Sequence, residues 1–353
     1  MCDPLRVLLS GPGLIGVKHV SLLNQSPHTE LVGLVAPNHV HNIEFAAAQG
    51  VPRFNLIEDA LALGGVNAVI VSSPNANHFE QSRACIMAGL PVLVEKPFTD
   101  TLNSAARLVE LAESLGTPVL VGHHRTYSPL LEVARNFIVS EQFGSPVSVQ
   151  GSAMFFKPKD YFEAGRWRTL KGGGPVLINL IHEVGILRHL FGEIESVTAH
   201  LSNATRGFEV EDTAAITMYF ANGALGSFLL SDTSASSKSW EMTAGENPVY
   251  PFFPEQDCYH FAGTMGSIDF PTMRVRSYAG RHQSWWSPFQ EQRYDIMRED
   301  PLALQLQHFV EVARGHARPR VSARDGYANM VVVEAIRRAA ETRREVAISE
   351  VSE

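Results

Sequence analysis

Short apolar runs alternate with helical patterns over the first 122 residues, and no other feature of the sequence constrains the fold as strongly. Each run is too short for a helix and is bounded by glycine, proline or polar residues, which is typical of a buried strand. Strands that alternate with helices form a parallel sheet with helices on both faces. The predicted extended segments are residues 5–10, 31–35, 51–54, 68–72, 91–94 and 119–121.

A glycine-rich turn follows the first predicted strand. Residues 11–16 read GPGLIG, and a helical pattern comes directly after them. The order strand, G-x-G-x-x-G, helix places backbone N–H groups and a helix N-terminus against a pyrophosphate, so the pattern predicts a doubly wound, dinucleotide-binding Rossmann domain over residues 1–124. An ordinary glycine-rich turn is the alternative. The predicted cofactor contacts in this turn are Gly11, Gly13, Leu14, Ile15 and Gly16.

The end of the second predicted strand bears on the choice between NAD and NADP. A dinucleotide-binding fold usually carries an acidic residue there, which holds the adenosine ribose hydroxyls. This chain reads Ala36-Pro37-Asn38-His39 and has no carboxylate at that point. A 2′-phosphate would therefore meet no repulsion, but we expect no nearby arginine to bind it. Asn38 is a predicted cofactor contact, and NAD and NADP stay open as alternatives.

Two further strand exits carry polar residues. Open α/β sheets bind ligands at the carboxyl ends of their strands, so we expect both exits to face the cofactor. A lysine at the second exit indicates a functional role, whereas a surface lysine paired with its glutamate neighbour is the alternative. The predicted cofactor contacts are Ser73, Pro74, Asn75 and His78 at the first exit and Glu95 and Lys96 at the second.

From residue 125 the pattern changes to runs of strands joined by tight turns. Such runs indicate a large, mostly antiparallel open sheet, and hence a second domain of α+β type over residues 125–353. Two amphipathic helices near the C-terminus are free to pack back on the first domain. We expect residues 246–256 and 283–291 to be the least regular. The predicted strands are residues 147–155, 194–201, 214–220, 224–231, 240–244, 258–261, 267–270 and 274–278.

One helix interrupts the strands of the second half. It follows the glycines at 172–174, runs to about residue 191, and carries Asn179 and His182 at a spacing that places both on one face. A lone histidine on an apolar helix is usually a core residue, and that is the alternative here. The neighbouring asparagine and the glycine turn favour a functional role for His182.

Composition excludes several classes of function. The 353-residue chain has a net charge of −8 and no basic block, so neither nucleic acid nor an anionic membrane is an expected partner. Cys2, Cys85 and Cys258 are too few and too far apart for a disulfide framework or a zinc site, and no metal is expected. The N-terminus lacks the features of a signal peptide. We therefore expect a soluble cytoplasmic protein.

Taken together, these motifs resemble the Gfo/Idh/MocA oxidoreductases, the family of glucose-fructose oxidoreductase and inositol 2-dehydrogenase. The resemblance covers essentially the whole chain. Glu95-Lys96-Pro97 and the block from Gly172 to His182 form a specific pair, although each alone would be weak. The other matching features are residues 11–16, Pro74-Asn75 with His78, residues 122–125 with Tyr127 and Pro129, Trp167-Arg168, and residues 319–326.

The resemblance implies an NAD- or NADP-dependent dehydrogenase that oxidises a secondary alcohol of a sugar, cyclitol or related polyol. Lys96 would bind the reacting hydroxyl and lower its pKa, His182 would be the acid/base, and Asn179 would support it. This chain departs from many relatives, which have an aspartate in place of Asn179 and a second one in place of Gly185. The residues that would contact substrate are Arg125, Tyr127, Lys157, Tyr161, Trp167 and Arg168.

Two other activities stay open within the resemblance. Cations and aromatic residues near the predicted pocket could suit a cis-dihydrodiol of an aromatic acid, although those cations could equally be solvated. Some relatives use bound NAD transiently to cleave glycosides, which makes a glycoside hydrolase the other alternative. An open sheet in the second domain offers a broad face for self-association, and a homodimer or homotetramer is expected.

Overall fold

The computed structural model describes residues 3–280 and 282–352. They fold into two compact units. The first unit comprises Met1–His124 and Leu302–Met330, and the second comprises Arg125–Pro301 and Val331–Glu353. Helix α11 (Ala323–Thr342) is continuous and contributes to both. Cys2, which enters the predicted absence of a disulfide framework, lies outside the described residues, whereas Cys85 and Cys258 are free thiols and buried.

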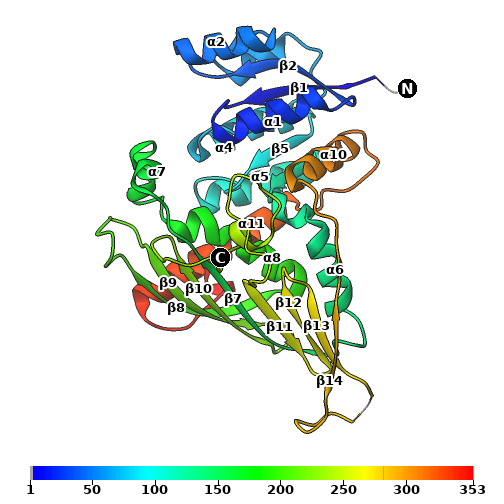
Figure 1. Cartoon of the computed structure of the whole chain (residues 1–353). Coiled ribbons are helices and arrows are strands. Elements are labelled where there is room, and N and C mark those ends of the chain that lie inside the picture. The colour runs from blue at the N-terminus through cyan, green and yellow to red at the C-terminus, as the bar shows by residue number, and fades with distance from the viewer. Residues whose placement is uncertain (1–2, 281, 353) are drawn as a thin grey trace. The chain divides into compact units, whose positions relative to one another are not determined.

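The first unit contains a six-stranded sheet in the order β3-β2-β1-β4-β5-β6, and all its strand pairs are parallel. This is the order of a doubly wound dinucleotide-binding sheet, which confirms the predicted fold class for this half. Figure 1 shows α1, α2 and α4 beside the blue and cyan strands. The strands are β1 Leu5–Ser10, β2 Thr29–Val35, β3 Arg53–Phe54, β4 Ala68–Val71, β5 Val92–Glu95 and β6 Val119–Gly122.

Helix α5 of the first unit begins and ends where the sequence signals it. Thr101 caps α5 through a hydrogen bond from the N–H of Ser104, and Gly116 ends that helix in the left-handed conformation. Strands β4, β5 and β6 are buried at every residue, as expected for a sheet covered on both faces. The helices are α1 Leu14–Gln25, α2 Val40–Gln49, α3 Ile57–Ala62, α4 His78–Met87, α5 Leu102–Leu115 and α10 Pro301–Ala313.

The second unit contains a nine-stranded sheet in the order β14-β13-β12-β11-β7-β10-β9-β8-β15. Its pairs are antiparallel except for β10 with β7, which confirms the predicted mostly antiparallel sheet. The strands are β7 Pro146–Met154, β8 Ile194–Ser202, β9 Thr213–Phe220, β10 Leu225–Ser231, β11 Tyr259–Gly263, β12 Gly266–Phe270, β13 Arg274–Tyr278, β14 Phe289–Arg293 and β15 Val346–Ala347. The helices are α6 Pro129–Ile138, α7 Lys159–Glu163, α8 Ile181–Phe191, α9 Trp240–Thr243 and α12 Ser349–Ser352.

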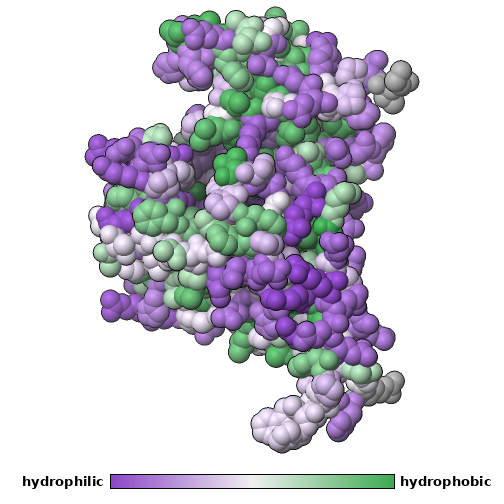
Figure 2. Space-filling view, in the orientation of Figure 1, coloured by the Kyte–Doolittle hydropathy of each residue, from purple (hydrophilic) through white to green (hydrophobic). Residues whose placement is uncertain are grey.

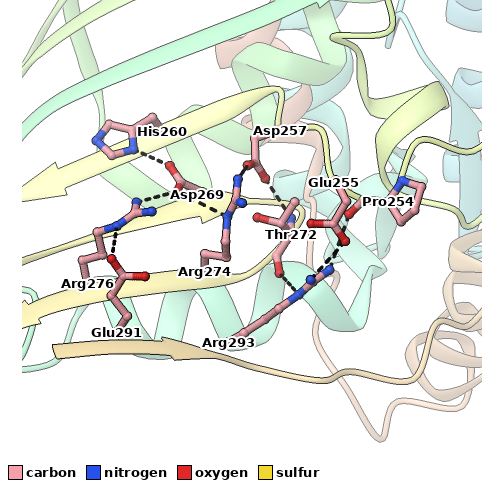
Figure 3. Close-up of polar contacts among 10 residues, drawn as sticks. All are labelled: Pro254, Glu255, Asp257, His260, Asp269, Thr272, Arg274, Arg276, Glu291 and Arg293. Carbon is pink, nitrogen blue, oxygen red and sulfur yellow. Dashed lines mark hydrogen bonds and ion pairs between the residues drawn. The ribbon is translucent and has the colours of Figure 1, made fainter.

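One face of this sheet is apolar and covered, and the other is polar. Phe191 of α8 packs against Phe220 and Phe261 on the covered face, with ring centroids 5.3 and 5.6 Å apart. On the opposite face Asp269 pairs with His260 and Arg276 across neighbouring strands (Figure 3). Figure 2 shows hydrophilic residues gathered over β11 to β13. Cross-strand charge pairs of this kind suit a solvated sheet face.

Two predicted elements were placed wrongly. Residues 240–244 were expected to be a strand, but Trp240–Thr243 forms α9, in which Thr243 Oγ1 donates to the carbonyl of Ser239. Part of 283–291 was expected to be irregular, yet Phe289–Arg293 pairs with β13 as β14. Both errors concern short segments whose state is decided by tertiary packing, which overrides local propensity.

Candidate functional site

The glycine turn of the first unit packs tightly against backbone atoms. The carbonyls of Ser10 and Gly11 accept hydrogen bonds from Ser72 Oγ, at 3.0 and 2.9 Å. Gly11 has φ of +86°, and a Cβ there would lie 2.4 Å from Ser73 Cα. A Cβ on Gly16 would lie 2.1 Å from the Gly11 carbonyl oxygen. Neither position therefore accepts a side chain, which is the packing that the motif requires.

The start of α1 fits a bound pyrophosphate. Gly13 is the N-cap, no side chain among the described residues caps the helix, and its first turn holds no acidic residue. A Cβ on Gly13 would meet no atom within 4 Å, so this side of the turn is open. The N–H groups of the first helical turn have no partner within the helix, and the helix dipole favours an anion at this end. Gly13, Leu14 and Ile15 are the residues that would hold the phosphates.

His78 links the two predicted loop exits. Its side chain is buried, with Nε2 2.8 Å from the carbonyl oxygen of Ser73 and Nδ1 2.9 Å from that of Pro97. Burial lowers the pKa of His78, although both carbonyls and the charge of Glu95 oppose the shift. The structure thus places His78 between the loops as a brace, while Ser73 Oγ donates to Gln81 Oε1 at 2.8 Å.

Glu95 is buried at the end of β5 and bonds to a histidine. His19 Nε2 on α1 lies 2.8 Å from Glu95 Oε1, and the N–H of Lys96 donates to Glu95 Oε2 at 3.3 Å. Burial alone would raise the pKa of Glu95, but its hydrogen bond with His19 and the nearby charges of His19, His124 and Lys96 lower it. The carboxylate therefore stays ionised and fixes the backbone from which Lys96 extends. His19 was not among the predicted site residues, because no neighbouring motif in the sequence singles it out.

An arginine lies at the end of β2, where we expected none. Arg53 is on β3, and its Nη2 lies 3.0 Å from Asn38 Oδ1 while its Nη1 lies 2.7 Å from the carbonyl oxygen of Ala36. The expectation failed because strand pairing, and not chain distance, brings Arg53 to this loop: it pairs in register with Leu34.

In the second unit, Lys157 and Asn179 lie together. Lys157 Nζ donates to Asn179 Oδ1 at 2.7 Å and lies 3.6 Å from Asp232 Oδ2. Lys157 and His182 are buried, at 9% and 5% exposure. Asn179 belongs to a π-helical turn (Val176–Leu180), and α8 with His182 follows directly. The α-helical spacing argument for a shared face of Asn179 and His182 therefore does not apply across this turn.

Two of the glycines before this helix are at positions where a side chain would clash with neighbouring atoms. A Cβ on Gly173 would lie 2.7 Å from the Trp167 carbonyl oxygen, and one on Gly174 would lie 2.5 Å from Glu211 Oε1. Glu211 accepts a hydrogen bond from the N–H of Val176 at 2.8 Å, so it anchors the start of the π turn. Burial raises the pKa of Glu211, and the Val176 bond opposes that shift.

Four of the predicted substrate contacts lie together. The guanidinium carbon of Arg168 lies 4.1 Å from the centroid of the Tyr161 ring and 5.5 Å from that of Trp167. The ammonium of Lys157 lies 5.0 Å from the Tyr161 centroid. Trp167 is 52% exposed. The structure brings these residues together as a surface with aromatic and cationic character.

Arg125 forms ion pairs with residues of its own unit. It is buried, and its guanidinium pairs with Glu183 at 2.5 Å and with Glu241 at 2.6 Å. Burial opposes its charge, but Glu241 and Glu183 outweigh burial and raise the pKa of Arg125. Tyr259 donates to the second oxygen of Glu183. A substrate contact was predicted for Arg125, yet the geometry gives it a structural role; Tyr127, also predicted, is buried as well.

The described residues offer neither a metal site nor a membrane-spanning helix. Among the described residues, no group of three or more His, Cys, Asp or Glu side chains is placed to hold a metal ion. No helix in the described part of the chain is long and apolar enough to cross a membrane.

A hollow of about 680 Å³ lies on the polar face of the nine-stranded sheet, where Thr217, Tyr219 and Ser227 contribute to its lining. It lies on the face opposite to α8 and contains none of the predicted site residues.

Two family models match the chain. Residues 5–123 match "Oxidoreductase family, NAD-binding Rossmann fold", and residues 135–348 match "Oxidoreductase family, C-terminal alpha/beta domain" of the GFO_IDH_MocA models.

Curated relatives match over part of their length. One is 4-carboxy-2-hydroxymuconate-6-semialdehyde dehydrogenase of Sphingobium sp., 30% identical over 47% of this chain and 52% of that protein. Another is inositol 2-dehydrogenase of Corynebacterium glutamicum, 31% identical over 43% of this chain and 46% of that protein. The chain thus spans about half the length of the curated relatives it matches.

Solved structures match over the whole chain. The WlbA dehydrogenase from Bordetella pertussis in complex with NADH and UDP-GlcNAcA is 23% identical, with a TM-score of 0.78 over 98% of this chain and 99% of that one. An oxidoreductase from Agrobacterium radiobacter in complex with NAD+, L-tartaric acid and magnesium is 18% identical, with a TM-score of 0.83 over 99% of each chain. At these identities the likeness concerns the fold.

Proposed function

Because the chain belongs to the Gfo/Idh/MocA oxidoreductase family, as its motifs predict, we propose that it is an NAD(P)-dependent dehydrogenase acting on a secondary alcohol of a sugar, cyclitol or related polyol. The observation that carries the proposal is the uncapped start of α1 beside a turn that excludes side chains at Gly11 and Gly16. Curated relatives include inositol 2-dehydrogenases, which makes cyclitols the first substrates to test.

The proposed chemistry divides between two side chains. A bound nicotinamide would supply the hydride acceptor for the carbinol carbon. Lys96 would bind the reacting hydroxyl and favour its ionised form, and His182 would take the proton as general base. Asn179, held by Lys157, would fix the start of the helix that carries His182. Ser73, Pro74 and Asn75 would line the cofactor near the ribose, and Tyr161, Trp167 and Arg168 would contact the substrate.

The experiment is a screen of polyols and sugars for reduction of NAD and NADP, followed by His182→Asn and Lys96→Met. We expect each variant to lower kcat/KM by at least about a hundredfold, the usual contribution of a general acid or base. His200→Asn is a matched control, since His200 is exposed on β8 of the same unit. Activity that survives both active-site changes would refute the assignment of these two residues.

A second candidate is an acidic substrate. Lys157 and Arg206 both pair with Asp232, and Arg168 lies over the ring of Tyr161, which offers an aromatic surface. Guanidinium and ammonium groups bind carboxylates well, which would suit a sugar acid or a cis-dihydrodiol of an aromatic acid. The Sphingobium relative's name also contains a carboxylated compound. Adding aldonic acids and dihydrodiol acids to the screen separates these substrates from neutral polyols.

The same screen tests the hydrolytic alternative. A dehydrogenase reduces one cofactor for each alcohol oxidised, whereas a glycoside hydrolase that uses NAD transiently would release a free sugar from a glycoside without net reduction. Stoichiometric formation of NADH or NADPH with a free polyol would therefore exclude hydrolysis as the main activity.

We also propose a homo-oligomer that associates through the polar face of the nine-stranded sheet. Tyr219, Leu225 and Leu229 are exposed there, at 43%, 60% and 48%, and supply apolar area within a polar surround. Light scattering during gel filtration should report a dimer or tetramer, and Leu225→Glu should shift it towards the monomer. We propose a cytoplasmic location, where Cys85 and Cys258 would stay reduced.

A further inference from the structure

The exit of β2 is built around an arginine from the neighbouring strand. β3 pairs with β2 so that Arg53 lies beside Leu34, and its side chain extends along the β2 exit. The guanidinium donates to the carbonyl of Ala36 at 2.7 Å, to Asn38 Oδ1 at 3.0 Å and to Asn55 Oδ1 at 2.8 Å. Arg53 is therefore held in place before any ligand arrives.

This arginine retains the capacity to bind an anion. A guanidinium has five N–H donors, and the three hydrogen bonds named above use three of them. Its acceptors are two amide side chains and one carbonyl, all uncharged, so its positive charge is not neutralised by them. A planar fork with this geometry suits a phosphate monoester, which accepts two parallel hydrogen bonds.

The surroundings favour an anion at the same place. Residues 36–39 contain no carboxylate. Helix α2 begins at Val40 next to this loop, has no side-chain cap among the described residues and carries no acidic residue in its first turn. Its N-terminus therefore adds a favourable dipole to the charge of Arg53. Where an acid would repel a 2′-phosphate and bind ribose hydroxyls, this chain presents a cation and an amide.

We infer that Arg53 and Asn38 bind the 2′-phosphate of the adenosine ribose, and that the chain prefers NADP(H) to NAD(H). The inference rests on the proposed function, because the adenosine end of the cofactor must lie at the β2 exit. The binding step is an equilibrium in which no covalent bond is formed or broken, so it can be measured without knowledge of the alcohol substrate.

Isothermal titration of the full chain with NADP and NAD, and with 2′,5′-ADP and 5′-AMP as fragments, tests the inference. We expect wild type to bind NADP at least about tenfold more tightly than NAD, and 2′,5′-ADP more tightly than 5′-AMP, since charge-assisted bidentate pairs are the stronger hydrogen bonds. Arg53→Gln should raise the dissociation constants of NADP and 2′,5′-ADP by about 10- to 100-fold. The dissociation constant of NAD should change by less than about threefold.

The controls separate this inference from the proposed function. Arg6→Gln removes an arginine at the opposite end of the same sheet, where it bonds to Gly65 and Glu30, and should change no dissociation constant. If Arg53→Gln does not fold, Asn38→Asp takes its place and should reverse the preference towards NAD. Equal or tighter binding of NAD by wild type would overturn the inference alone. Failure to bind any dinucleotide would overturn the proposed function with it.

Discussion

Replacement of His78 by alanine tests whether this residue braces the loops that follow β4 and β5. Its ring nitrogens lie 2.8 and 2.9 Å from carbonyl oxygens of Ser73 and Pro97, inside a buried site. A neutral ring donates to one carbonyl, which contributes about 1 kcal/mol, and truncation leaves buried carbonyls and a cavity that cost about 1–3 kcal/mol more. We expect a total loss of about 2–4 kcal/mol. Asn77→Ala is the matched control, because Asn77 is exposed.

Hydrogen exchange gives the local readout. A loss of about 2 kcal/mol corresponds to a roughly 30-fold faster exchange where exchange occurs through local opening. We expect this acceleration in peptides that cover residues 94–99, with peptides of the nine-stranded sheet unchanged. Exchange in 94–99 that accelerates less than about threefold would refute the role as a brace.

The pH dependence of the wild type supplies an independent check on His78. Burial lowers the pKa of this histidine in the folded state below its ordinary value of 6.5. Between the two pKa values the unfolded chain binds more protons than the folded one, so stability rises with pH. The contribution is therefore complete above pH 6.5 and is lost as the pH falls through the folded pKa. His78→Gln should remove this part of the pH dependence below pH 6.5.

Three further changes follow from buried contacts. Burial raises the pKa of Glu246 to about 7, so its ionisation costs stability as the pH rises from 4.5 through 7, and Glu246→Gln should stabilise the protein by about 1–3 kcal/mol at pH 8 but not at pH 4 in urea denaturation. Arg125→Met should destabilise by about 3–5 kcal/mol, because Glu183 and Glu241 would lose their buried partner; an effect below 1 kcal/mol would contradict the described network. Gly16→Val should abolish dinucleotide binding in a titration, whereas Gly50→Ala, at an open left-handed helix end, should leave binding intact and cost only stability.

The cofactor half could be predicted from the sequence because its signals are local. The turn at residues 11–16 and the helix ends at Gly50 and Gly116 each depend on residues within a few positions of one another. Periodicity then fixes the strands, and chirality and short connections restrict how the strands are ordered. The choice between NAD and NADP cannot be predicted in this way, because its signal is not local. It depends on Arg53 and Asn38, which are 15 residues apart and meet only through strand pairing.

In the second unit, the geometry could not be predicted from the sequence where it depends on residues far apart in the chain. The π turn at Val176–Leu180 is anchored by Glu211, 35 residues further along the chain, so α-helical spacing alone does not determine the relation of Asn179 to His182. The same holds for Arg125, which sequence motifs present as a free cation. Its partners Glu183 and Glu241 lie 58 and 116 residues away.

These distances also explain why Arg125 is better understood as a positioning residue than as a substrate contact. Glu183 follows His182 in the chain, and it is fixed by Arg125 on one oxygen and by Tyr259 on the other. Because Glu183 is held at two points, the backbone that carries His182 has little freedom to move. Catalytic groups need such support to keep a productive geometry. A substrate carboxylate would instead have to displace Glu183 or Glu241 from a buried pair. The cost of that exchange favours Arg168, which is only half-buried, over Arg125 as a cation that meets substrate.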